Sequence, residues 1–143
     1  MIPKKILVPT DYSDTAEHGT RYALELAQAL GAKVTILHVY VIPTPPEGGG
    51  FASDFVRETQ QVAEKELQQA TAKYQGTPAL AAAKLATGEP TDAILNAARE
   101  LGADLIVIGT HGRSGVRRML LGSVAESVLR AAPCPVLAIR SPS

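Results

Sequence analysis

Residue types that build covalent or metal-bound scaffolds are scarce in this sequence of 143 residues. Cys134 is the only cysteine, so the chain cannot form an internal disulfide, which fits a reducing compartment. Three histidines and one cysteine without metal-ligand spacing predict no structural zinc site. Tryptophan is absent, and two phenylalanines and four tyrosines leave few side chains that could stack on a flavin.

An excess of charge and long apolar runs are missing as well. Fourteen basic and fourteen acidic side chains cancel, so no overall charge attracts the protein to nucleic acid or to an anionic membrane. No apolar run approaches the ~18 residues of a membrane span, and residues 1–6 lead into a strand without the apolar region of a signal peptide. We therefore expect a cytoplasmic protein with one domain, residues 1–143.

Short apolar runs alternate with stretches of helical periodicity along the chain. Strands are predicted at residues 6–8, 34–39, 80–86, 105–108 and 136–139. Helices are predicted over residues 14–30, 55–74, 91–101 and 124–131. This order predicts an α/β fold of the Rossmann-like kind, because parallel strands need helical crossovers. We expect a single open five-stranded parallel sheet of order 3-2-1-4-5, with helices on both faces.

Two helix starts and one loop carry further predictions. Asp14 followed by Glu17 resembles a capping box at the first helix, and Thr91 is the expected cap of the third. Residues 43–53 are rich in proline and glycine and predict a loop within the domain. That loop is either a lid over a ligand crevice or a plain surface loop.

A glycine-rich segment after the fourth strand is typical of an anion site. Gly109 and Gly112 are followed, after nine further residues, by Gly122 and Ser123 at the start of the last helix. Glycines let the backbone approach a ligand closely and reach positive φ, and the first N–H groups of a helix have no partner within it. The expected anion is the polyphosphate of a nucleotide.

Two common nucleotide-binding devices are absent. The sequence has no Gly-x-x-x-x-Gly-Lys-Ser/Thr motif, and residues 9–13 follow the first strand where dinucleotide-binding folds have Gly-x-Gly-x-x-Gly. In the predicted sheet the switch point lies between the first and fourth strands, and ligands bind there beyond the carboxyl ends. Asp11 and the segment 109–123 are therefore expected to flank one crevice.

Six short motifs are spread over almost the full length of the chain. They are Lys5-Ile6-Leu7-Val8-Pro9-Thr10-Asp11 with Ser13, Leu37-His38-Val39, Gly88-Glu89-Pro90, Gly109-Thr110-His111-Gly112-Arg113-Ser114-Gly115, Gly122-Ser123-Val124-Ala125-Glu126 and Cys134-Pro135-Val136-Leu137. Together they resemble the universal stress protein family, and the Gly-x2-Gly-x9-Gly-Ser spacing resembles its ATP-binding branch. Ile108 departs from the pattern, since the family often has methionine there, but isoleucine keeps that wall apolar.

The resemblance implies a site for ATP, or for ADP or AMP, with Mg²⁺ able to accompany the nucleotide. The residues that it implies as nucleotide-binding are Pro9, Thr10, Asp11, Val39, Gly88, Ile108, Gly109, His111, Gly112, Arg113, Gly122, Ser123 and Val124.

Three of these residues have competing interpretations. Asp11 could contact the nucleoside or its metal ion, or it could be a turn aspartate that caps the first helix. His111 has no carboxylate or nucleophile visibly paired with it, so orienting the loop or contacting ribose is favoured over general-base catalysis. Arg113 could balance phosphate charge or be simply solvated. For Cys134, no cationic neighbour in the sequence predicts a reactive thiolate.

The expected function is that of an ATP-binding regulatory protein of the stress response, without catalytic residues and with slow hydrolysis at most. A slow Mg²⁺-dependent ATPase or phosphotransferase using the same pocket remains an alternative, as does an interaction protein that binds no nucleotide. A flavodoxin-like domain is less favoured because stacking aromatics are few. We also predict a homodimer through residues 136–139, an apolar edge strand. The alternative is an open edge, or one shielded by residues 141–143.

Overall fold

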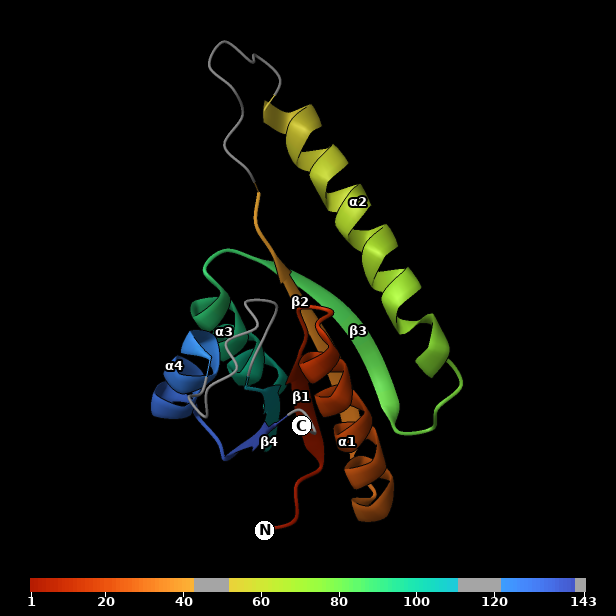
Figure 1. Ribbon diagram of the computed structural model, residues 1–143, viewed down its shortest axis with the longest axis vertical. Helices are drawn as coiled ribbons and strands as arrows, with labels where there is room; N and C mark the ends of the chain where they lie inside the picture. Colours follow the sequence, from red (N-terminus) through yellow and green to blue (C-terminus); the bar gives the residue numbers. More distant parts are fainter. Residues whose placement is uncertain (43–51, 111–121, 141–143) are drawn as a thin grey trace.

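The computed structural model describes residues 1–42, 52–110 and 122–140, and its centre is one parallel β-sheet (Figure 1). The strands are β1 (Lys5–Pro9), β2 (Lys33–Tyr40), β3 (Leu80–Thr87), β4 (Leu105–Gly109) and β5 (Val136–Ile139). Their order is β3-β2-β1-β4-β5, and every neighbouring pair is parallel. The predicted fold class and strand order are confirmed. Among the described strands, β3 and β5 are therefore the two edges of the sheet.

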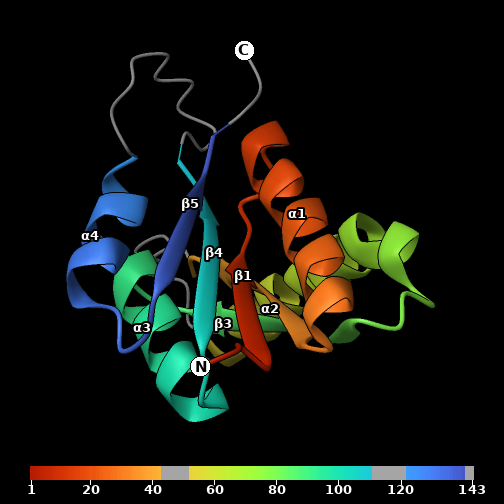
Figure 2. The ribbon, with the colours of Figure 1, turned by 90° about the horizontal axis from the view of Figure 1, so that it is seen from below.

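Helices cover both faces of this sheet (Figure 2). They are α1 (Asp14–Leu30), α2 (Ala52–Thr71) with the short 3-10 helix η1 (Ala72–Tyr74), α3 (Pro90–Leu101) and α4 (Ser123–Ala131). Side chains alternate along a strand, so Ile6 and Val8 pack with α1, whereas Leu7 packs on the face of α3 and α4. No helix in the described ranges is long and apolar enough to cross a membrane.

The helix starts differ from those predicted. Ser13 is the N-cap of α1, because its backbone is extended and its Oγ accepts from the N–H of Ala16 at 3.2 Å. The predicted capping box at Asp14 is therefore wrong, and Asp14 is the first helical residue. Thr91 is not the cap of α3 either. Glu89 takes that place, since its carboxylate accepts from the N–H groups of Asp92 at 2.9 Å and Thr91 at 3.0 Å, which lowers the pKa of this carboxyl.

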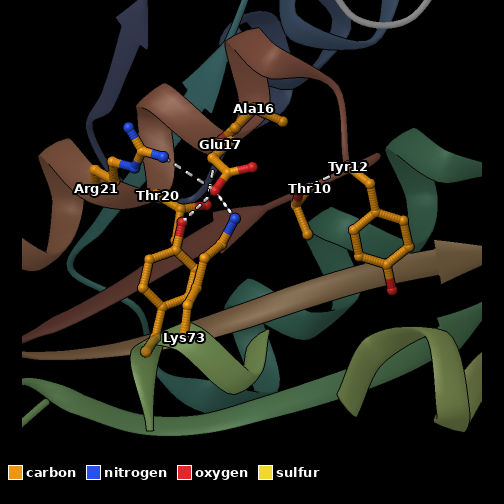
Figure 3. A network of polar contacts seen from close by, with 8 residues as sticks. Thr10, Tyr12, Ala16, Glu17, Thr20, Arg21 and Lys73 are labelled. Atoms are coloured by element: carbon orange, nitrogen blue, oxygen red, sulfur yellow. Dashed lines mark hydrogen bonds and ion pairs between the residues drawn. The ribbon is translucent and has the colours of Figure 1, made fainter. Parts of the chain in front are cut away.

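One carboxylate joins α1 to the end of α2 (Figure 3). Oε1 of Glu17 accepts from the Tyr74 hydroxyl at 3.1 Å and lies 3.3 Å from Nη2 of Arg21, and Lys73 forms an ion pair with the same oxygen. Lys73 and Tyr74 belong to η1, so these contacts connect elements more than fifty residues apart. The cluster fixes η1 against the face of the sheet that α1 covers.

Replacing Glu17 by glutamine is expected to lower the free energy of unfolding by about 1 kcal/mol, because two ion pairs lose their charge while one hydrogen-bond acceptor remains. Urea unfolding followed by circular dichroism measures the change. Glu25→Gln on the same helix is the matched control, since Glu25 is exposed and has no ion pair among the described residues. Equal stabilities of the two variants would contradict the prediction.

Candidate functional site

A cavity of about 380 Å³ lies beyond the carboxyl ends of β1, β2 and β4. Residues from α1, α3 and α4 form its remaining walls. The chain reverses its direction of winding here, because β1 lies between β2 and β4 in the sheet. Ligands of open α/β sheets bind at such switch points, and the volume lies within the ~300–1,000 Å³ that is typical of small-molecule sites.

The structure brings most of the predicted site residues together around this cavity. Those that line it are Pro9, Thr10, Asp11, Val39, Ile108, Gly109, Gly122, Ser123 and Val124. Gly88 does not line it; this glycine has a φ of 117° in the turn between β3 and α3, two residues before the lining residue Pro90. The predicted residues His111, Gly112 and Arg113, and the predicted loop 43–53 up to residue 51, lie outside the described residues.

Several residues of the cavity wall were not predicted from the sequence. They are Ser13, Ala16, Leu37, Pro90, Ile94, Thr110 and Ala125. Five of them, all except Ala16 and Ile94, belong to the motifs quoted above. Membership of those motifs was the signal that could have identified them. Ile94 and Ala16 lie on helices, and only the packing of α3 and α1 brings them to the cavity.

The N-terminus of α4 faces the cavity without a side-chain cap among the described residues. Gly122 is the N-cap, and the first bond of the helix runs from the N–H of Glu126 to the Gly122 carbonyl at 2.9 Å. The three preceding N–H groups, of residues 123–125, therefore have no partner within the helix. Ser13 and Glu89 cap α1 and α3, whereas α4 has no side-chain cap among the described residues and presents its first N–H groups and the positive end of its dipole to the cavity.

Close packing surrounds both described glycines of the loop, most tightly at Gly122. A Cβ on Gly122 would lie 2.6 Å from the Thr110 carbonyl oxygen, which also accepts from the Gly122 N–H. A Cβ on Gly109 would lie 3.0 Å from Cγ2 of Thr15, where α1 crosses the end of β4. Neither glycine has a positive φ, so that part of the prediction is wrong for these two positions. Close approach of the backbone explains them instead.

Asp11 lies on the opposite wall, in the turn between β1 and α1. Its Oδ1 accepts from the N–H of Ser13 at 3.0 Å, so it supports the turn that precedes the helix. Because Ser13 itself is the cap, the interpretation of Asp11 as the helix cap is wrong. Asp11 is the only ionisable residue among the described residues that line the cavity.

Cys134 does not belong to the cavity wall that the structure describes. Burial raises the pKa of the Cys134 thiol, and the nearby Asp104 carboxylate raises it further. A thiol with a raised pKa is less ionised at neutral pH, in agreement with the sequence interpretation. In the described ranges, no three histidine, cysteine, aspartate or glutamate residues are grouped so that they could hold a metal ion.

These features define a Rossmann-like α/β protein with a ligand crevice at the switch point of its sheet. The model of the universal stress protein family matches residues 3–140, and the chain belongs to that family. Universal stress protein MJ0531 of Methanocaldococcus jannaschii is 36% identical over 97% of this chain and 83% of its own length. A universal stress protein of Thermus aquaticus is 40% identical over 96% of this chain and 98% of its own.

Solved structures agree with the fold. The hypothetical protein MJ0577 has a TM-score of 0.84 and 26% identity, and the match covers 100% of this chain and 99% of that chain. A universal stress protein from Archaeoglobus fulgidus in complex with dAMP has a TM-score of 0.66 and 32% identity over 97% and 99% of the two chains. The structure of a universal stress protein in complex with cAMP has a TM-score of 0.69 and 29% identity, and the match covers 96% of this chain and 97% of that chain.

Proposed function

We propose that this protein binds an adenine nucleotide in the cavity, with ATP as the preferred ligand, and acts as a regulatory protein of the stress response. The observation that carries the proposal is the uncapped N-terminus of α4 at the rim of a largely apolar cavity. One end of the cavity suits phosphate and the remaining walls suit a purine ring. The dAMP and cAMP complexes of two related structures support an adenine nucleotide as the ligand class.

In this arrangement the adenine ring lies against Val39 and Ile108, and Asp11 accepts a hydrogen bond from the nucleoside. The phosphates accept hydrogen bonds from the N–H groups that follow Gly122 and from the hydroxyl of Ser123. Mg²⁺ bound with the triphosphate would take its ligands mainly from phosphate oxygens and water. Since Asp11 is the only ionisable side chain on the described wall and the sequence has no P-loop lysine, we expect slow hydrolysis at most.

Mass spectrometry of small molecules released from freshly purified, denatured protein identifies the bound nucleotide, and isothermal titration calorimetry gives its affinity. An adenine nucleotide in the released fraction and saturable binding of ATP are the expected results. Protein that carries no nucleotide and binds none of ATP, ADP, AMP and cAMP at millimolar concentration would contradict the proposal.

Asp11→Ala is expected to weaken ATP binding more than tenfold, because the nucleoside loses a charged acceptor, an interaction of about 1.5–3 kcal/mol. Asp11→Asn is the matched variant, since its amide oxygen can still accept from the Ser13 N–H and support the turn. Calorimetry and thermal unfolding separate the two roles. Normal affinity together with lowered stability in Asp11→Ala would restrict Asp11 to a turn residue.

We further propose that the protein forms a homodimer through β5. This strand is an edge of the sheet, next to β4 alone among the described strands (Figure 2). Val136, Leu137 and Ala138 are each partly exposed, which is unusual for three successive apolar residues on an open edge. Two copies of β5 meeting antiparallel across a two-fold axis would satisfy both edges.

A further inference from the structure

The turn that forms one wall of the cavity has an unusual backbone conformation. Tyr12 is the only residue other than glycine with a positive φ in the described ranges, at 66°. This left-handed region disfavours residues that carry a Cβ, so contacts from neighbouring parts of the fold must maintain it. Tyr12 follows Thr10 and Asp11, which both line the cavity.

His38 of β2 holds this turn through two contacts. Its Nδ1 lies 2.8 Å from the Thr10 carbonyl oxygen, and its ring stacks on that of Tyr12 with centroids 4.2 Å apart and an angle of 24° between the planes. A carbonyl oxygen can only accept, so the contact requires a proton on Nδ1. The Thr10 N–H in turn donates to the Leu37 carbonyl at 2.8 Å, so both main-chain polar groups of Thr10 are bound to β2.

His38 itself lies away from the cavity. Leu37 and Val39 line the cavity and His38 does not, as expected from the alternation of side chains along a strand. Its ring reaches the turn from the face of the sheet that α1 covers. Figure 3 shows Thr10 and Tyr12 at this turn, joined by the bond from the Tyr12 N–H to Oγ1 of Thr10 at 3.0 Å.

We propose that His38 is a positioning residue for the nucleotide. By bonding the Thr10 carbonyl and stacking on Tyr12, it keeps Thr10 and Asp11 in the conformation that faces the ligand. It thereby raises nucleotide affinity without touching the nucleotide. This inference rests on the proposed function, because it requires that the cavity binds an adenine nucleotide.

Two substitutions separate the contacts that His38 makes. His38→Phe keeps a ring against Tyr12 and removes the donor, and His38→Asn keeps an N–H donor close to the position of Nδ1 and removes the ring. Losing the donor leaves a partly buried carbonyl without its partner, and we expect His38→Phe to weaken ATP binding about tenfold. His38→Asn is expected to stay within about threefold of the unsubstituted protein, which corresponds to less than the energy of one neutral hydrogen bond. Calorimetry with ATP and thermal unfolding without ligand are measured for each variant.

His18→Phe is the control, because it makes the same histidine-to-phenylalanine change on α1, outside the cavity wall. This variant should leave ATP affinity unchanged. Nitrogen-15 NMR of the ring measures whether Nδ1 carries the proton that the contact with Thr10 requires, with and without nucleotide. Recovery of ATP affinity in His38→Asn relative to His38→Phe is the readout that a merely structural role would not require. An Nε2–H tautomer, or equal affinity of His38→Phe and the unsubstituted protein, would overturn the inference and leave the proposed function standing. Failure of the unsubstituted protein to bind any nucleotide would instead contradict the proposed function.

Discussion

Gly122→Val is expected to lower the affinity for ATP at least about thirtyfold, which corresponds to ~2 kcal/mol for the loss of hydrogen bonds to a charged group. Any side chain at this position must displace the Thr110 carbonyl, which would lie 2.6 Å from the added Cβ. The same carbonyl accepts from the Gly122 N–H and joins the end of β4 to the start of α4. Opening that link moves the first N–H groups of α4 away from the proposed phosphate position.

Calorimetry with ATP measures this effect, and circular dichroism establishes that the variant is folded. Ser123→Ala is the matched control: it removes one hydroxyl from the same helix start and introduces no clash, so its loss of affinity should be clearly smaller. Unchanged affinity in folded Gly122→Val protein would show that the phosphates do not lie at the start of α4.

Gly109 and Gly122 also show the limit of reading a loop from its sequence. The sequence placed Gly109 at the end of a strand and Gly122 at the start of a helix, and the structure has both glycines there. The need for glycine depends on tertiary neighbours. An added Cβ would contact Thr15 at Gly109 and the Thr110 carbonyl oxygen at Gly122. The sequence does not show which backbone segments pack against each glycine. The expected positive φ was therefore the wrong explanation for both positions.

The sheet was predictable for a different reason. Runs such as Leu105–Ile108 are apolar without interruption, and only a strand buried on both faces accounts for such a run between two helical patterns. The caps were harder to predict, since Ser13 and Asp14 are both good N-cap residues and only the extended backbone of Ser13 decides between them. At α3, Glu89 caps although glutamate is not a favoured N-cap, because Pro90 occupies the first helical position.

The contacts of His38 cannot be predicted from any local sequence pattern. Its partners Thr10 and Tyr12 lie more than twenty-five residues away in the sequence, and the contact exists only because β1 and β2 are parallel neighbours. The motif Leu37-His38-Val39 marks the strand, but it does not distinguish the side chain that faces the cavity from the one that faces the turn. That distinction follows from the register of the sheet, in which Pro9 pairs with Leu37.

Ala138→Pro is expected to dissociate the proposed dimer while leaving the cavity intact. The Pro135 and Ile139 carbonyls accept from β4, from the N–H groups of Ile106 and Thr110, each at 3.0 Å. Main-chain groups alternate in direction along a strand, so the N–H of Ala138 points away from β4 to the outer edge. Proline there removes a donor from the edge and none from the bonds to β4.

In a two-fold symmetric interface each contact occurs twice, so one substitution removes two hydrogen-bond donors. At ~1–3 kcal/mol for each donor, the dimer is expected to be weakened at least about thirtyfold. Light scattering at micromolar concentration should report twice the chain mass of 15.0 kDa for the unsubstituted protein and the chain mass itself for Ala138→Pro. Ala138→Val is the matched control, because it keeps the N–H and favours a strand, so it should remain dimeric. ATP affinity should be the same in all three, since β5 does not line the cavity. A monomer for the unsubstituted protein would refute the dimer outright, and a dimer that survives Ala138→Pro would place its interface on a surface other than this edge.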